Sequence, residues 1–290
     1  MGDNLFVIGN GLDLYFGLPT KTDDFCNCLR ADAVDFYSEC GINWSSWEEG
    51  LEDIDIDEAN MLVESAPDYM SDSEDDREGT VIEAEEKLNE ILELRNRALE
   101  TMVAKANSEL IMKRLNHKLP SYNKNLFSNS TIINFNYTST VEKLFDIDNS
   151  YDWHIHGCYE DDDQLIFGFD KRKGYSQNYH KRLYGDTSRD IDPYIFRQYE
   201  KVLEFYDDNC KKYQTEKLVK VLKDYNSKKV DSIVVLGHSM GDVDHQYMEI
   251  IEKILKPDMW IISYYKNTEN YDDYSFSSRI QQMPLEKLIN

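Results

Sequence analysis

NLFVIGNGLDLYFGLP, residues 4–19, is the stretch from which the rest of the chain can be interpreted. Its apolar run, residues 5–8, indicates a buried strand. Gly9-Asn10-Gly11 follows at once, and glycine allows both a sharp turn and a close approach of a ligand to backbone N–H groups. A helix beginning near Leu12 would direct its N-terminal dipole to the same point, which favours phosphate. The spacing is G-x-G without the third glycine, so a nucleotide-binding turn and a plain strand–turn–helix connection both fit.

The composition excludes several classes of protein. The chain has 290 residues, 41% hydrophobic and 30% charged, which is typical of a globular protein with a substantial core. Its formal net charge of −24 should repel nucleic acid and anionic membranes, so we expect neither direct DNA binding nor membrane association. No apolar run approaches the roughly 20 residues of a membrane span. Asp3 and Asn4 stand where a signal peptide would be basic, which favours a cytoplasmic location.

The cysteines indicate reduced thiols rather than a disulfide framework. Their number is odd, they are scattered, and no CxxC pair occurs, which also argues against a structural zinc site. We therefore expect no metal. The five are Cys26, Cys28, Cys40, Cys158 and Cys210.

Apolar strands alternate with helical patterns along the chain, which predicts an α/β fold with a mostly parallel, Rossmann-like sheet flanked by helices. We expect a single domain over residues 1–290, with an acidic, helical insertion over residues 45–128. The strands after the first are predicted at residues 130–135, 152–155, 165–167, 232–236 and 259–264. The helices are predicted near residues 22–40, 80–119, 138–145, 191–225 and 243–255, with a short one from residue 274.

The predicted insertion begins near two tryptophans, Trp44 and Trp47, which fit core or lid packing. Glu48 beside them could reach a pocket. Residues 48–86 contain seventeen Asp or Glu and one basic residue, which is typical of a solvated loop and helix face, with a partner surface as the alternative. Residues 71–79 are predicted to be a disordered loop, and residues 171–187 an ordinary loop.

Polar residues fall at the predicted carboxyl ends of the strands, where parallel sheets bind their ligands. They are the Gly9 turn, Asn136, His156, Gly168 and the Gly237-His238-Ser239 turn. This coincidence favours the nucleotide-binding interpretation of the first turn.

Asn136 and His156 are the candidate reactive residues. The Asn136 amide donates and accepts, so it can hold a water or a substrate hydroxyl, although it could instead cap the following helix. His156 has an ordinary pKa near 6.5, which suits a general base, although a structural histidine also fits. His154 lies two residues earlier and should point the same way in a strand. The pair could bind a metal ion, but no third ligand is evident.

Gly237-His238-Ser239-Met240-Gly241 matches the G-x-S-x-G elbow of serine hydrolases. Such an enzyme needs its acid and its histidine on separate later loops, and the only later histidine is His245, inside a predicted helix. We therefore favour a second glycine turn that holds phosphate or ribose. Asp242 or Asp244 would lie near the helix start, where either could also serve only as a cap.

Six short motifs occur in the order typical of one family. GNGLDLYFGLP, WSSWE, NFNYT, HIHG, IFGFD and GHSMGDVD make the chain resemble the bacterial phage abortive-infection family AbiH, from Leu5 to about Asp244. The same motifs resemble a divergent sirtuin, a family that binds NAD on a Rossmann-like sheet and cleaves its nicotinamide bond. Sirtuins carry GAGIS, SGIP, a QN segment, HG, a phenylalanine-glycine turn and GTS.

The resemblance implies a role for individual residues. Asn136 would be the catalytic asparagine and His156 the catalytic histidine. The contacts to NAD or a related nucleotide would come from Gly9, Asn10, Gly11, Asp13, Gly237, His238, Ser239 and Asp244.

The function that follows is phage defence by cleavage of NAD, as substrate, to nicotinamide and ADP-ribose. A homo-oligomer or a phage-derived activator would control so toxic an activity. The alternatives are a sensor that binds a nucleotide or ADP-ribose without cleaving it, and a serine esterase at Ser239. The sirtuin CxxC pairs are missing, Tyr137-Thr138 replaces a sirtuin aspartate, and Asp13 replaces the serine of GAGIS.

Overall fold

A computed structural model describes residues 3–64, 71–128, 130–147, 152–161, 163–170, 192–225, 230–268, 271 and 274–290. The loop predicted at residues 171–187 lies outside these ranges. The chain divides into two compact units. One contains residues 1–21, 100–166 and 213–290 and holds the sheet; the other contains residues 22–99 and 167–212 and is helical. The predicted insertion over residues 45–128 stays a prediction.

The first unit is built on a sheet of six strands that all run parallel, which confirms the predicted Rossmann-like α/β class. Its order is β3-β2-β1-β4-β5-β6. This order changes direction between β1 and β4, and open α/β sheets bind ligands beyond the carboxyl ends of the strands at such a switch point. The strands are β1 (Asp3–Ile8), β2 (Thr131–Asn134), β3 (Asp152–His154), β4 (Val230–Leu236), β5 (Met259–Tyr264) and β6 (Arg279–Pro284).

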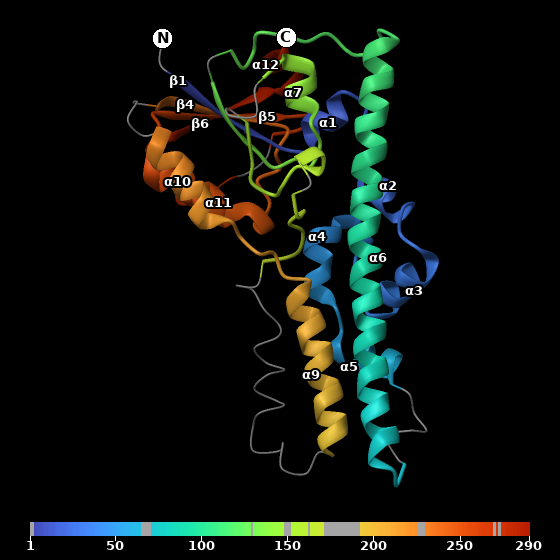
Figure 1. Ribbon diagram of the computed structural model, residues 1–290. Helices are drawn as coiled ribbons and strands as arrows, with labels where there is room; N and C mark the ends of the chain where they lie inside the picture. Colours follow the sequence, from blue (N-terminus) through green and yellow to red (C-terminus); the bar gives the residue numbers. More distant parts are fainter. Residues whose placement is uncertain are drawn as a thin grey trace. The chain divides into compact units, whose positions relative to one another are not determined.

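Both faces of the sheet are buried, which explains why β1 is apolar without alternation. Leu5 and Val7 face helices α10 (Thr215–Tyr225) and α11 (His245–Leu255). Phe6 and Ile8 face the other core, formed with α1 (Gly11–Tyr15), α7 (Thr140–Phe145), α12 (Leu285–Ile289) and the last turns of α6 (Glu74–Leu115). Figure 1 shows the helices on the two sides of this sheet.

Two predictions about strands were wrong. The segment from residue 274 was predicted as a helix, but it forms β6 and only then α12. β6 reads RIQQMP and is an edge strand, so it lacks the apolar run that marks the buried strands. Residues 165–167 form no strand; nearby, Phe169 makes one isolated bridge to Cys210.

The helical unit packs around aromatic side chains. Its helices are α2 (Thr22–Cys26), α3 (Ala31–Glu39), α4 (Trp47–Gly50), α5 (Ile56–Val63), α9 (Pro193–Asp208) and the first part of α6 (Glu74–Leu115). Phe36 and Tyr37 of α3 contact the ring of Phe205 from α9. Trp44 donates to Ser38 Oγ at 2.9 Å and meets Tyr37 edge-on, which agrees with the predicted packing role. Glu48 lies 3.5 Å from the buried Lys211 ammonium.

The acidic stretch is more ordered than predicted. A loop was expected over residues 71–79, but α6 begins at Glu74 and is 42 residues long. Acidic and basic groups of α6 pair with α9 and the residue before it: Glu78 with Arg197, Glu85 with Lys201 at 3.1 Å, and Arg77 with Asp192. Net acidity in sequence concealed these pairs, because the two members of each pair lie more than a hundred residues apart in the chain.

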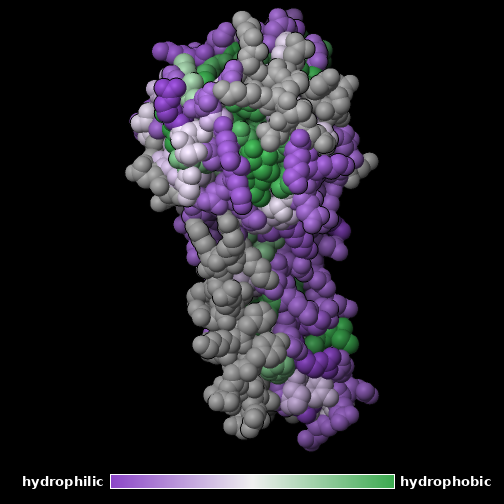
Figure 2. Space-filling view, turned by 90° about the vertical axis from the view of Figure 1, so that its left-hand side faces the viewer, coloured by the Kyte–Doolittle hydropathy of each residue, from purple (hydrophilic) through white to green (hydrophobic). Residues whose placement is uncertain are grey.

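The helix predicted over residues 191–225 is in fact two, α9 and α10. The chain leaves α9 at Asn209, whose side-chain amide donates to the Phe205 carbonyl at 2.9 Å. None of the described helices has the length and apolarity needed to cross a bilayer. The face drawn in Figure 2 is mainly hydrophilic where the structure describes it, as expected from 30% charged residues.

Candidate functional site

The two glycine turns pack against each other at the switch point of the sheet. The Gly9 N–H donates to the Leu236 carbonyl at 3.0 Å, and the Gly11 N–H donates to the Gly237 carbonyl at 2.6 Å. A Cβ on Gly237 would lie 2.3 Å from the Leu12 nitrogen, and the φ of +66° at Gly237 disfavours any other residue. The glycines therefore permit one backbone to lie directly on another.

This packing changes the predicted mode of phosphate binding. The N–H groups of Gly9, Gly11 and Gly237 all donate within the protein, the last to Ser263 Oγ at 2.8 Å. α1 is only five residues long, so its dipole contributes little. Among the described residues, no acceptor takes the backbone N–H of Asn10 or Ser239, which leaves these two as donors for a ligand.

Asp13 is buried and bound by hydroxyl groups. Thr138 and Thr140 donate to its two carboxylate oxygens at 2.7 and 2.6 Å. Burial raises the pKa of Asp13 to about 6, against the opposing effect of these hydrogen bonds. Its carboxylate joins α1 to the start of α7.

Asn136 has a rigid backbone and an unsatisfied side chain. Its N–H donates to Asn134 Oδ1 at 3.0 Å, and His154 Nδ1 donates to its carbonyl at 2.7 Å. The helix-capping alternative is wrong, since α7 begins at Thr140 with Ser139 at the cap position. Within the described residues the Asn136 Nδ2 is buried and has no hydrogen-bond partner. Such an orphaned donor is unusual in a folded protein and fits a group that awaits a ligand.

His154 is a hydrogen-bonded interior residue. Its Nε2 lies 2.8 Å from Glu142 Oε1 while its Nδ1 serves Asn136. Burial lowers the pKa of His154, but hydrogen bonds to Cys158 and Glu142 and the nearby Asp152 charge outweigh this and raise it to about 11. The expectation that His154 and His156 point the same way was wrong, because β3 ends at His154 and the chain turns before His156.

Asp244 bridges two histidines. Its Oδ1 lies 3.2 Å from His156 Nε2, and its Oδ2 lies 3.3 Å from His238 Nε2. All three residues are buried. Asp244 occupies the N-cap position of α11, yet its side chain makes no capping hydrogen bond. The capping alternative is thus wrong for Asp244, whose carboxylate contacts the two histidines instead.

One hydrogen bond determines which ring nitrogen of His238 carries the proton. Since the Met240 N–H donates to His238 Nδ1 at 2.8 Å, that nitrogen carries no proton and Nε2–H faces Asp244. The ring of Phe135 contacts both histidines edge-on, with its centroid 5.1 Å from that of His156 and 4.5 Å from that of His238. The next residue along the chain is Asn136, which carries the orphaned amide.

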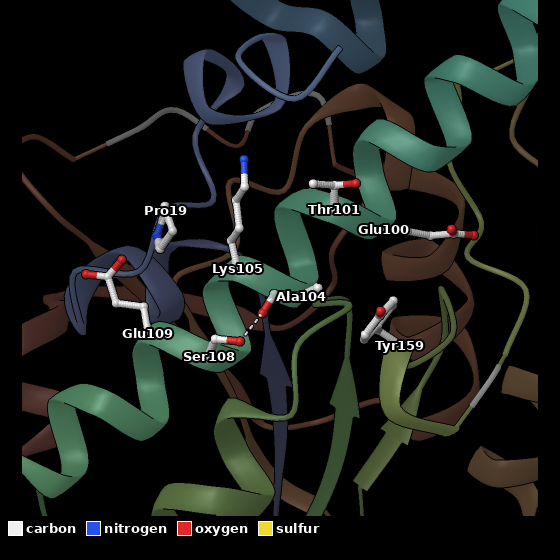
Figure 3. A pocket seen from close by; sticks show the side chains of 8 residues that line it. All are labelled: Pro19, Glu100, Thr101, Ala104, Lys105, Ser108, Glu109 and Tyr159. Atoms are coloured by element: carbon white, nitrogen blue, oxygen red, sulfur yellow. Dashed lines mark hydrogen bonds between the residues drawn. The ribbon is translucent and has the colours of Figure 1, made fainter. Parts of the chain in front are cut away.

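A pocket of ≈ 730 Å³ is lined by residues of α6 together with Pro19 and Tyr159, which Figure 3 draws. In this view the Ser108 hydroxyl is turned back to the Ala104 carbonyl, 2.8 Å away, while Lys105 extends from the helix. The lining residues are Pro19, Glu100, Thr101, Ala104, Lys105, Ser108, Glu109 and Tyr159.

None of the predicted site residues lines this pocket, but hydrogen bonds connect it to them. Asn10 Nδ2 donates to the carbonyl of Thr20, the neighbour of Pro19, at 2.7 Å. The Tyr159 N–H donates to the carbonyl of Tyr137, the neighbour of Asn136, at 3.1 Å. Thr20 Oγ1 and Asn107 Nδ2 are also buried without a partner among the described residues. Unsatisfied polar atoms therefore gather on this side of the sheet, next to the pocket.

Not every predicted residue joins this group. The described residues include no hydrogen bond between Asn136 and His156. Ser239 is exposed, and no histidine bonds to it in the described part of the chain, which leaves the elbow without its base. Gly168 packs against Asn209 in the helical unit rather than ending a strand of the sheet.

Sequence reasoning missed the partnership between Asp244 and the two histidines, as well as Thr20, Asn107 and Glu142. The GHSMGDVD motif did contain both His238 and Asp244, but their separation of six residues says nothing of a third partner from the turn after β3. Only the strand order brings His156 to them.

Comparison with known proteins decides the family. A family model described as "Bacteriophage abortive infection AbiH" matches residues 5–264. The chain belongs to the AbiH family. No match was found among curated proteins or solved structures. The match spans both glycine turns, Asn136, His156 and Asp244, so every predicted site residue of this AbiH protein lies within the family region.

Proposed function

We propose that this AbiH protein acts in phage abortive infection by cleaving the glycosidic bond between nicotinamide and ribose in NAD. The observation that carries the proposal is the contact of one buried carboxylate, Asp244, with both His156 and His238 at the switch point of a Rossmann-like sheet. A carboxylate that orients an imidazole is the usual arrangement for a histidine base.

His156 would be the base. Asp244, whose Oδ1 lies 3.2 Å from His156 Nε2, would stabilise the positive charge that His156 gains when it takes a proton from water. Cleavage breaks the C1′–N bond, and its electron pair leaves with neutral nicotinamide. The ribose becomes oxocarbenium-like, as in other glycoside cleavage. Water then bonds to C1′ and loses its proton to His156, giving ADP-ribose.

Asn136 would hold the water or the ribose. Its Nδ2 is the buried donor without a partner among the described residues, and its backbone is held on both sides by Asn134 and His154. A fixed amide lowers the cost of ordering the reacting water. The pyrophosphate would take the backbone N–H groups of Asn10 and Ser239.

The test is to incubate the pure protein with NAD and to follow nicotinamide by chromatography. We expect nicotinamide release, with His156→Ala and Asn136→Ala each losing about 10²-fold or more in rate. Asn116→Ala and His117→Ala, at two exposed positions just after α6, are the matched controls and should retain the wild-type rate.

Three other outcomes would contradict this proposal. Binding of NAD or ADP-ribose without any loss of NAD would favour the sensor. NAD consumption that survives both Ala variants would move the active site elsewhere. Labelling of Ser239 by a fluorophosphonate probe would favour the esterase, but Ser239 is exposed and no histidine of the described ranges bonds to it, so we expect no labelling.

A further inference from the structure

A second group of chemically active side chains lies behind Asn136. Glu142 of α7, His154 at the end of β3 and Cys158 in the following turn each offer one ligand atom, and these atoms all lie within 4.8 Å of one another. Cys158 and His154 are buried, and the Glu142 side chain is 12% exposed. The set combines a thiol, an imidazole and a carboxylate, which are the three ligand types that zinc takes in proteins.

The outer contacts resemble those around a metal-binding histidine. His154 Nδ1 donates to the Asn136 carbonyl at 2.7 Å, and a ligating histidine commonly gives its second N–H to such a carbonyl. This bond fixes the ring so that Nε2 faces Glu142.

Further oxygen donors surround the same point. Asp152 Oδ2 lies 3.9 Å from His154 Nε2, and the Asp152 side chain is fully buried. Asp152 Oδ1 and Glu142 Oε2 are both buried without a hydrogen-bond partner among the described residues. Orphaned carboxylate oxygens are costly in an interior, and a cation would satisfy them.

We propose that Glu142, His154 and Cys158 bind one divalent transition-metal ion, zinc in preference, with Asp152 as the additional oxygen donor. Bonds of 2.0–2.3 Å in a tetrahedron place ligand atoms roughly 3.3–3.8 Å apart. Nε2 and Oε1, now 2.8 Å apart, would separate slightly, and the thiol would move inward. The ion displaces the proton between His154 and Glu142 and the thiol proton of Cys158.

The spacing of the cysteines along the chain would not reveal such a site. The cysteine spacing excludes a four-cysteine site, but here the ligands come from a helix, a strand end and a turn, and only H-x-x-x-C is visible in sequence. The ion would hold His154, and through it the backbone of Asn136. This inference does not depend on NAD cleavage.

The test uses cobalt(II) as a spectroscopic probe on the full chain, stripped of metal and kept reduced. We expect about one cobalt ion per chain, a thiolate-to-cobalt charge-transfer band, and displacement of cobalt by zinc. Cys158→Ser should abolish the band, and Glu142→Gln should weaken binding about 10-fold or more. Cys26→Ser, a half-buried thiol elsewhere, is the matched control and should keep the band.

No cobalt uptake, uptake without the thiolate band, or a band that persists in Cys158→Ser would overturn the proposal. Because Cys158→Ser could unfold the protein, X-ray absorption spectroscopy at the zinc K-edge of the zinc-loaded wild type provides a second measurement. One sulfur neighbour with nitrogen and oxygen neighbours is expected, and a shell without sulfur would overturn the assignment.

Discussion

Asp244 lies at the N-cap of a helix, but its side chain contacts two histidines instead of capping the helix. An aspartate at an N-cap ordinarily accepts from the first helical N–H groups. Here the cap bond is absent and the carboxylate oxygens face His156 and His238. The local stabilisation forgone is about 1 kcal/mol. Its loss is understandable if the contact with the histidines serves the reaction.

Replacing Asp244 tests this role. Asp244→Asn keeps the size of the side chain but removes the charge that orients the imidazoles, so kcat for NAD cleavage should fall about 10²–10⁴-fold. Asp242→Asn, an exposed neighbour in the same turn, is the matched control and should change kcat little. Equal rates in the two variants would remove Asp244 from the mechanism.

Asp13 should impose a pH dependence on stability. Burial raises its pKa from 3.8 to about 6, so the folded state binds this proton more tightly than the unfolded chain does. Its contribution to stability therefore declines as pH rises from about 4 to 6. The rise of about two pH units in the pKa of Asp13 corresponds to about 3 kcal/mol of folding stability.

Asp13→Asn removes this titration and can still bond to both threonines. Relative to wild type, its free energy of unfolding should improve by up to about 3 kcal/mol between pH 4 and pH 7. Urea denaturation at the two pH values measures the difference. A difference that does not change with pH would show that Asp13 is ionised throughout.

At the scale of elements, the β1–α1 and β4–α11 connections form one structural unit, because Gly11 donates to Gly237 and neither turn has space for a Cβ. Gly237→Ala combines a left-handed φ with a backbone clash. It should lower the free energy of unfolding by more than about 1 kcal/mol.

Gly79→Ala is the contrasting control. Gly79 lies in α6 with open space around its Cα, so alanine there should raise stability by about 0.5–1 kcal/mol. Thermal unfolding of both variants gives the comparison. Gly237→Ala as stable as wild type would mean that the two turns separate readily.

The elements that could be predicted are those whose burial shows in their own residues. β1, β2, β4 and β5 were predicted from apolar runs, and the two turns from their glycines. β6 was not, since an edge strand with polar residues leaves no such pattern. In the site, Asn136, His156 and Asp244 could be proposed individually, but the contact of Asp244 with both histidines depends on the strand order.

For the whole molecule, the net charge of −24 sets expectations that do not depend on any site. Mutual repulsion between the acidic groups should lower stability at low ionic strength. Raising the salt concentration from about 0.01 M to 0.15 M should therefore raise Tm, because the screening length falls from about 30 to 8 Å.

The same net charge predicts that the protein passes through a heparin column without retention at low salt. Retention would reveal a cationic surface that the overall charge conceals.

The position of bound NAD is the most direct test of the proposed site. A crystal structure of Asn136→Ala, which should bind but scarcely cleave, soaked with NAD tests this directly. We predict the nicotinamide ribose within hydrogen-bond distance of His156, with the pyrophosphate against the turns at Asn10 and Ser239. NAD bound at another part of the sheet, with His156 and Asp244 untouched, would contradict the account.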